Sequence, residues 1–69
     1  MEQHIFGERI KELRKENELK QTQLAKDLCV TSACVVKWEK GTRAPDLNML
    51  IKVAKYFKVS ADYLIKRLL

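Results

Sequence analysis

The chain has 69 residues, of which 46% are hydrophobic and 33% charged, so it has the size and composition of one small folded domain. This composition excludes a disordered chain, and no apolar run reaches the roughly 18 residues of a membrane span or resembles a secretion signal. We therefore expect a single domain over residues 1–69 with no membrane partner. The formal charge of +5 favours an acidic partner, nucleic acid above all.

The positive charge is concentrated in the second half of the chain. Residues 1–36 carry six Lys or Arg and six Asp or Glu, which cancel, whereas residues 37–58 carry six basic and two acidic residues, a local charge of +4. Lysine is also the ordinary solvent-facing residue of helices, so charge alone leaves a plain solvated surface open as an alternative.

Hydrophobic residues recur at helical spacing along the chain, and strand-like alternation is absent. Phe6, Ile10 and Leu13 form the inner face of a first helix, which ends near Asn17, a residue that tolerates a left-handed turn. A second, shorter helix is predicted over residues 21–28.

Capping residues mark three further helices. Thr31 is the predicted N-cap of a third helix that runs to about Lys40 and closes at Gly41, while Asp46 caps a fourth helix and Ser60 a fifth. The predicted fold is an all-α, compact bundle of five short helices. The inner faces of the last two helices are predicted to hold Leu47, Leu50, Ile51, Ala54 and Phe57 in the fourth and Ala61, Leu64, Ile65 and Leu68 in the fifth.

The outer face of the third helix is unusual for a solvated surface. Its side chains are small at the N-terminal end, apolar in the middle and cationic at the C-terminal end; in chain order they are Ser32, Ala33, Val36, Lys37 and Lys40. Serine can hydrogen-bond a base edge or a phosphate, alanine and valine can meet a thymine methyl, and lysine can reach a guanine or a phosphate. We interpret this face as one that enters the major groove of double-stranded DNA. The alternative is that Ala33 and Val36 are ordinary exposed residues.

The sequence argues against a metal site and against catalysis. Cys29 and Cys34 are interpreted as free thiols of a reducing cytosol, and with His4 they remain one ligand short of the four that a zinc site needs. The chain has one histidine, no Gly-rich phosphate loop and no evident Ser/His/Asp set. We therefore expect no enzyme, no metal and no cofactor.

Several short motifs follow one another in a fixed order: QTQLA (21–25), VT (30–31), VVKWEKG (35–41), PDL (45–47) and Leu50, flanked by residues 7–14 and 59–64. As an ordered set over roughly residues 6–65, they resemble the phage-repressor/Cro-like (XRE-type) helix-turn-helix family. The resemblance implies a five-helix DNA-binding domain with its helix-turn-helix at about residues 21–40. The third helix would enter the major groove while the second crosses the DNA backbone.

The resemblance also implies roles for individual residues. Base contacts are carried over to Ser32, Ala33, Val36 and Lys37. Phosphate contacts are carried over to Gln21, Arg14, Cys34, Lys40, Thr42 and Arg43. It further implies a salt bridge between Arg14 and Glu39 that orients the third helix; the alternative is a solvated pair worth less than about 1 kcal/mol.

Three positions depart from the family's pattern. Lys20 stands where the family commonly has a serine N-cap, Glu18 where it often has a glycine, and Cys29 where the turn usually carries a glycine. If Cys29 takes a positive φ, the strain is about 1–2 kcal/mol relative to glycine. We expect these departures to alter the turn more than DNA binding.

A second apolar strip is predicted on the last two helices and the end of the chain, comprising Met49, Val53, Tyr56, Tyr63 and Leu69. We expect some of these residues to form an isologous homodimer contact, so that two recognition helices about 34 Å apart read a pseudo-palindrome. The alternative is that the fifth helix covers the strip within one monomer.

The predicted function is therefore that of a sequence-specific, double-stranded DNA-binding transcriptional regulator, acting as a repressor that occupies an operator. The resemblance implies a cytoplasmic protein, encoded by a prokaryote or a phage, with no small-molecule substrate. A second hypothesis is an antitoxin-like protein-interaction module, in which Met49, Val53 and Tyr56 of this strip form the functional surface and DNA binding is secondary or absent.

Overall fold

A computed structural model of the chain describes the backbone of residues 3–66 and the side chains of residues 5–66. Within these residues there are five helices and no strand: α1 (Gln3–Glu16), α2 (Gln21–Leu28), α3 (Ser32–Lys40), α4 (Leu47–Phe57) and α5 (Ala61–Ile65). The predicted all-α, five-helix fold is thereby confirmed. None of these helices is long and apolar enough to cross a membrane. Leu68, Leu69 and the side chain of His4, which enter the predictions above, lie outside the described residues.

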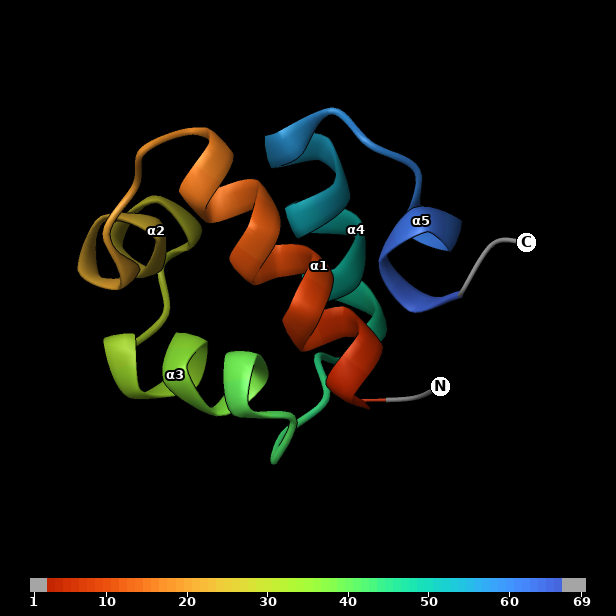
Figure 1. Ribbon diagram of the computed structural model, residues 1–69, viewed down its shortest axis with the longest axis horizontal. Coiled ribbons are helices and arrows are strands. Elements are labelled where there is room, and N and C mark those ends of the chain that lie inside the picture. The colour runs from red at the N-terminus through yellow and green to blue at the C-terminus, as the bar shows by residue number, and fades with distance from the viewer. Residues whose placement is uncertain (1–2, 67–69) are drawn as a thin grey trace.

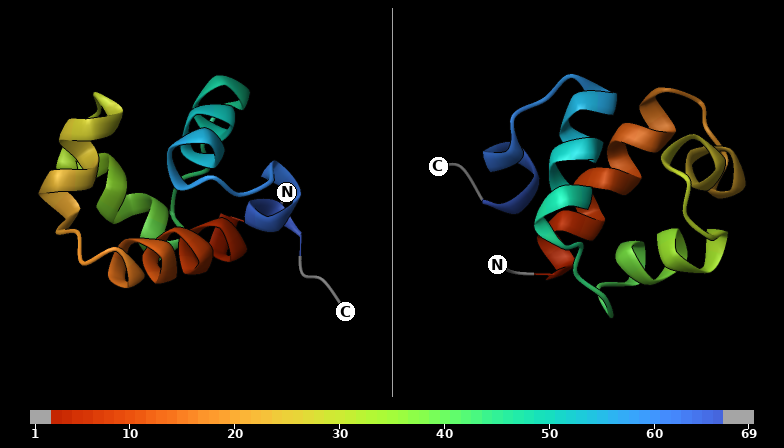
Figure 2. Two further views of the ribbon diagram at one scale, coloured as in Figure 1. Left: turned by 90° about the horizontal axis from the view of Figure 1, so that it is seen from above. Right: turned by 180° about the vertical axis from the view of Figure 1, so that it is seen from behind.

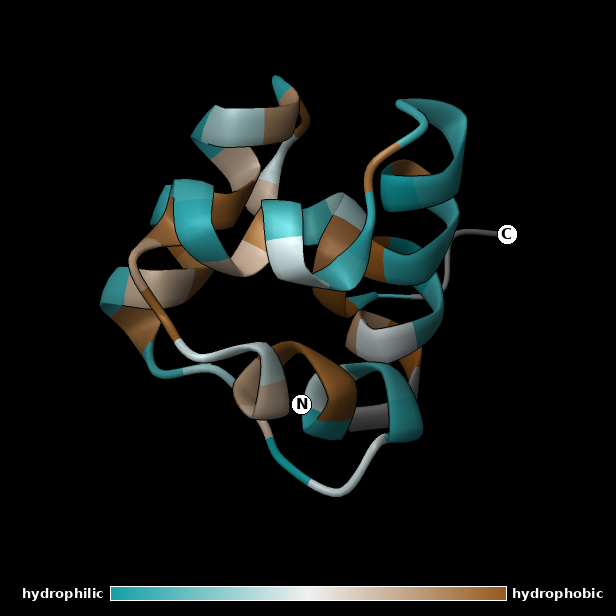
Figure 3. Cartoon of the chain, turned by 90° about the vertical axis from the view of Figure 1, so that its left-hand side faces the viewer, coloured by the Kyte–Doolittle hydropathy of each residue, from teal (hydrophilic) through white to brown (hydrophobic). Residues whose placement is uncertain are grey.

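Helix α1 lies between the α2–α3 pair and the α4–α5 pair (Figures 1 and 2). It packs against α3 and α5, while α2 packs against α3 and α4 packs against α5. Hydrophobic and hydrophilic segments alternate along the helices, as expected for amphipathic helices that bury one face (Figure 3). The largest fully buried side chains are Trp38, Phe6, Ile10, Leu24, Leu28, Leu64, Val35 and Val53.

A close approach between α1 and α3 holds the third helix against the core. A Cβ atom at Gly7 would lie 2.1 Å from the carbonyl oxygen of Trp38, so the absence of a side chain at this position lets the two backbones meet. The ring of Phe6, the preceding residue, meets the Trp38 indole edge to face, with centroids 5.6 Å apart. These contacts leave the opposite face of α3 directed away from α1.

The predicted N-caps of α3, α4 and α5 are confirmed. The Thr31 hydroxyl accepts a hydrogen bond from the Cys34 backbone N–H at 3.2 Å. In the same way the Asp46 carboxylate accepts from the third residue of its helix at 2.8 Å, and the Ser60 hydroxyl does so at 3.1 Å. Lys20, by contrast, makes no side-chain cap at the start of α2.

Helices α1, α2 and α4 are each followed, within two residues, by a non-glycine residue in the left-handed conformation. The φ angles are 56° at Glu18, 59° at Cys29 and 58° at Lys58. The positive φ considered for Cys29 is therefore present, and the left-handed residue after α1 is Glu18 rather than Asn17. Each of these helix ends thus stores strain that a glycine would not.

The predicted inner face of α4 is wrong at two positions. Leu47 is 70% exposed and Ile51 is 42% exposed, whereas Val53, assigned to the outer strip, is fully buried. The helix carries more apolar residues than one stripe needs, and packing against the core selects the face formed by Leu50, Val53 and Ala54. The spacing of residues within α4 does not by itself specify this rotation.

The same rotation changes the predicted dimer strip. Val53 is buried within the monomer and is not available to a partner. Met49 and Tyr63 are half-buried and pack against the core, while Tyr56 remains 37% exposed. The strip is therefore not a continuous outer surface of α4 and α5.

Candidate nucleic-acid interface

The face of α3 opposite the core carries the residues with predicted base contacts. Ser32, Ala33 and Lys37 are exposed and Val36 is half-buried, whereas Val35, between them in the sequence, is fully buried. This alternation follows from the helical period, because α3 buries one side against α1 and α2. The result is an accessible helix face with small side chains at its N-terminal end and a cation farther along.

Both cysteines lie in the segment that runs from the end of α2 into α3. Cys29 is exposed in the turn between α2 and α3, and Cys34 is half-buried on α3; both are free thiols. No group of three or more metal-ligating side chains occurs among the residues whose side chains are described.

The end of α3 and the loop after it add two further cations, Lys40 and Arg43. Gly41 closes the helix in a left-handed conformation, and the Thr42 hydroxyl donates a hydrogen bond to the Lys37 carbonyl at 3.3 Å. Lys40, Thr42 and Arg43 are exposed. Within the described part of the chain, none of Lys37, Lys40 and Arg43 forms a salt bridge. Their charges are therefore available to an anionic partner such as a phosphate backbone.

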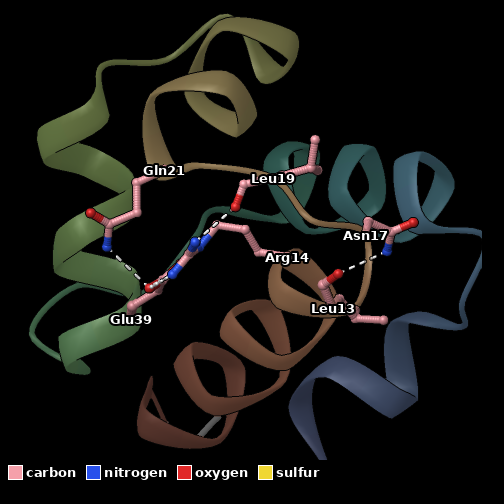
Figure 4. A network of polar contacts seen from close by, with 6 residues as sticks. All are labelled: Leu13, Arg14, Asn17, Leu19, Gln21 and Glu39. Atoms are coloured by element: carbon pink, nitrogen blue, oxygen red, sulfur yellow. Dashed lines mark hydrogen bonds and ion pairs between the residues drawn. The ribbon is translucent and has the colours of Figure 1, made fainter.

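A polar network ties α3 to α1 and α2 (Figure 4). Nε and Nη2 of Arg14 donate to the two carboxylate oxygens of Glu39 at 2.7 Å and 3.1 Å, which is a bidentate pair. Nη1 of Arg14 donates to the Leu19 carbonyl at 2.8 Å, and the Gln21 side-chain amide donates to Glu39 at 3.1 Å. One carboxylate thus joins the end of α1, the start of α2 and the end of α3.

The environment of this network is only partly accessible to water. The side chain of Arg14 is 13% exposed and that of Glu39 is 5% exposed. Hydrogen bonding to Glu39 raises the pKa of Arg14 above its ordinary value, so the guanidinium stays charged. The pair is therefore not a solvated surface contact. Three of the five N–H donors of Arg14 are engaged within the protein, and the other two have no hydrogen-bond partner among the described residues.

Gln21 is the first residue of the QTQLA motif, but its hydrogen bond to Glu39 does not follow from that motif. The two residues are 18 apart in the chain, and no local spacing rule relates them. One N–H of the Gln21 amide is engaged there, and the second has no partner among the described residues. Because Lys20 supplies no side-chain cap, the first N–H groups of α2 also lack a side-chain acceptor.

Two contacts from α4 hold the other end of α2, and neither follows from the sequence motifs. The Lys52 ammonium donates to the Leu28 carbonyl at 2.7 Å, and the Tyr56 hydroxyl donates to the Asp27 carboxylate at 2.5 Å. The hydrogen bond to Asp27 raises the pKa of the Tyr56 phenol above its ordinary value. Together with the Arg14 network, these contacts tie both ends of α2 to neighbouring helices.

The comparisons with known proteins agree with this arrangement. A helix-turn-helix family model matches residues 10–64. Over 62 residues the chain is 37% identical to YqaE of Bacillus subtilis, an uncharacterised HTH-type transcriptional regulator, and the match covers 90% of this chain and 53% of YqaE. Over 66 residues it is 32% identical to repressor protein C2 of Salmonella phage P22, and the match covers 96% of this chain and 31% of C2.

A solved structure shows the same fold. The solution structure of the SOS-response transcriptional repressor LexA from Eubacterium rectale superimposes with a TM-score of 0.88 at 26% identity, over 94% of this chain and 69% of that one. The chain spans about half the length of YqaE and about a third of C2.

Proposed function

Because the chain belongs to the helix-turn-helix family of DNA-binding transcriptional regulators, we propose that it is a repressor that occupies a pseudo-palindromic DNA operator as a homodimer. Membership confirms the resemblance inferred from the motifs and separates the chain from enzymes. A cytoplasmic location in a prokaryotic host is part of the proposal.

The observation that carries the proposal is that α3 exposes one face while its opposite face is packed against the rest of the domain. Ser32, Ala33 and Lys37 are exposed. On the same helix, Trp38 is only 2% exposed and the side chain of Glu39 only 5% exposed. A recognition helix must present its side chains to the major groove in a fixed orientation, because base-edge hydrogen bonds are short and directional. The rigid support of α3 meets this requirement.

The exposed positions on α3 and in the loop after it support the proposed contacts. The residues proposed to contact base edges are Ser32, Ala33, Val36 and Lys37. The residues proposed to contact phosphates are Gln21, Cys34, Lys40, Thr42 and Arg43, with Arg14 contributing its two remaining donors. Base contacts select the sequence, whereas phosphate contacts set affinity and its dependence on salt.

The test is selection of bound duplexes from a random double-stranded DNA pool at about 150 mM salt, followed by sequencing. Enrichment of a motif with two-fold symmetry supports the proposal and gives the half-site spacing directly. Enrichment of a single half-site retains the recognition helix but contradicts the homodimer.

The exposed apolar residues Leu47 and Ile51 favour a second candidate, an antitoxin-like module that binds another protein and DNA secondarily. Selection that enriches no sequence, with general binding that salt abolishes, favours this candidate over the operator-binding repressor.

A further inference from the structure

The turn between α2 and α3 leads directly into the N-terminal end of the proposed recognition helix. Its first residue, Cys29, has a left-handed backbone with a φ angle of 59°, although it is not a glycine. The side chain of Cys29 is exposed, so its packing does not hold the turn. Thr31 ends the turn as the N-cap of α3, and Ser32 and Ala33 follow. The position of this turn therefore sets the position of two residues that are proposed to contact bases.

Two side chains of α4 reach the residues immediately before this turn. The Lys52 ammonium donates to the Leu28 carbonyl at 2.7 Å, and the Tyr56 hydroxyl donates to the Asp27 carboxylate at 2.5 Å. Lys52 and Tyr56 are four residues apart, so they lie on the same side of α4, and their two partners are adjacent at the end of α2. We call these two hydrogen bonds the α4 clamp.

Both bonds of the α4 clamp stabilise polar groups at the end of α2. The last carbonyls of a helix lack partners within it, and a cation is favourable there because a helix C-terminus carries partial negative charge. Lys52 supplies both a donor and a cation to the Leu28 carbonyl. The carboxylate of Asp27 is unfavourable at this helix end, and hydrogen bonds from Tyr56 and, at 3.3 Å, from Gln23 compensate for this.

The α4 clamp also acts on the backbone of the turn. The Leu28 carbonyl belongs to the planar peptide unit that joins Leu28 to Cys29, so a bond that holds this carbonyl restrains the chain where it leaves α2. The close helix pairs of the fold are α1–α3, α2–α3, α1–α5 and α4–α5. Helices α2 and α4 are not such a pair, and the two long side chains of the clamp provide a polar link between them.

We infer that Lys52 and Tyr56 are positioning residues for DNA recognition. Through the α4 clamp they set where the N-terminal end of α3 lies, without contacting DNA themselves. This role rests on the proposed function, because the residues that the clamp positions are those proposed to contact bases. Base-edge hydrogen bonds are short and directional, so a small shift of this helix end changes the discrimination between bases.

The two ends of α3 are held by different contacts. Near the C-terminal end, Glu39 is bonded to Arg14 of α1, whereas the N-terminal end follows the turn that the α4 clamp restrains. Loss of the clamp is therefore expected to affect the base pairs read by Ser32 and Ala33 more than the base pair read by Lys37.

Three substitutions on α4 separate the α4 clamp from the charge of the helix. K52M removes the ammonium and keeps an apolar stem, and Y56F removes only the hydroxyl. K55M is the control, because it removes the same charge as K52M from an exposed residue of α4 that forms no salt bridge within the described part of the chain. All variants are compared at a temperature at which circular dichroism shows them to be folded. Y56F leaves the charge unchanged and tests the clamp independently if K52M does not fold.

Amide hydrogen exchange of the DNA-free protein measures the two ends of α3 separately. Backbone hydrogen bonds protect the N–H of Val30 in the turn and the N–H of Thr42 after α3. In K52M and Y56F, the Val30 N–H is expected to exchange at least about threefold faster than in the wild type, while the Thr42 N–H keeps its wild-type rate. K55M is expected to change neither rate. Equal acceleration at both positions, or none at Val30, overturns the inference.

Selection from the random duplex pool measures the consequence for DNA recognition. S32A and K37A first assign the base pairs that each end of α3 reads in the wild-type operator. In K52M and Y56F, the preference at the base pairs assigned to Ser32 is expected to fall at least about threefold, while that assigned to Lys37 is retained. A loss of affinity that is uniform over all sequences, with a smaller salt slope, would place Lys52 on a phosphate and contradict its positioning role.

The two measurements distinguish failure of the clamp from failure of the proposed function. If the wild type selects no DNA sequence and the exchange of Val30 responds as expected, the proposed function fails and the clamp is a structural contact alone. If the wild type selects a symmetric operator and both clamp variants select it with unchanged base preference, the positioning role fails and the proposed function stands.

Discussion

Arg14 and Glu39, which lie 25 residues apart, form a bidentate ion pair that anchors the C-terminal end of α3 to α1. The same carboxylate accepts a hydrogen bond from Gln21 at the start of α2. One carboxylate therefore links the proposed recognition helix to both α1 and α2.

Loss of the Glu39 charge is expected to destabilise the domain. Glu39→Gln leaves the guanidinium of Arg14 in a largely buried site with a weaker partner, at a cost of about 1–3 kcal/mol in the free energy of unfolding. Urea denaturation measures this change. The control is Asp62→Asn, which removes an exposed pair with Lys66 at 3.9 Å and is expected to cost less than about 0.5 kcal/mol. Equal effects of the two substitutions would mean that the Glu39 pair is no stronger than a surface contact.

The Tyr56 phenol is expected to make stability fall at high pH. Its hydrogen bond to Asp27 raises its pKa in the folded state above the ordinary tyrosine value of 10.0. The stabilisation is therefore complete below about pH 10 and is lost as the pH rises through the folded-state pKa. Urea denaturation at a series of pH values is expected to show a steeper loss for the wild type than for Tyr56→Phe in this range. Identical slopes would show that the phenol is not bonded in solution.

The left-handed residues at the helix ends are expected to accept glycine with a gain in stability. Cys29→Gly and Lys58→Gly each relieve strain at φ values of 59° and 58°, which raises the free energy of unfolding by about 1 kcal/mol. Thermal denaturation measures the gain. Cys29→Ala is the control, because it removes the thiol but keeps the Cβ atom. If alanine stabilises as much as glycine, the backbone explanation fails.

Gly7→Ala is expected to destabilise the domain although alanine is the better helix former. Helix propensity alone favours alanine by about 1 kcal/mol. The added Cβ atom would lie 2.1 Å from the Trp38 carbonyl oxygen, so α1 and α3 must separate, and overpacking of this kind costs about 1–3 kcal/mol. Thermal denaturation and the fluorescence of Trp38 report the change, and the exposed Lys11→Ala serves as the control on α1. An increase in stability would contradict the close approach.

Lys37 and Lys40 are expected to differ in their effect on DNA binding. If Lys37 contacts a base, Lys37→Ala weakens operator binding by about 1–3 kcal/mol and relaxes the base preference at one position. If Lys40 contacts a phosphate as proposed, Lys40→Ala weakens binding to all sequences alike and reduces the salt slope by about 1. Titration of operator and scrambled duplexes over a range of salt concentrations measures both. A uniform loss for both variants would place Lys37 on the backbone rather than on a base.

Features that depend on neighbouring residues in the chain could be predicted from the sequence. The caps at Thr31, Asp46 and Ser60 act on backbone groups three residues away, so the helix starts follow from local chemistry. The buried side of α3 could also be predicted, because Val35 and Trp38 are its large apolar residues and both lie on the same side of the helix. The pairing of Arg14 with Glu39 was predicted from the resemblance to a family and not from the spacing of the two residues.

Features that depend on contact between distant segments required the tertiary structure. Helix α4 offers two apolar stripes of similar hydrophobicity, and packing against the rest of the core buried Val53 and exposed Leu47. The bond from Gln21 to Glu39 likewise arises only when α2 and α3 meet. A helical period specifies which residues share a face, but the direction of that face is determined by the surfaces against which the helix packs.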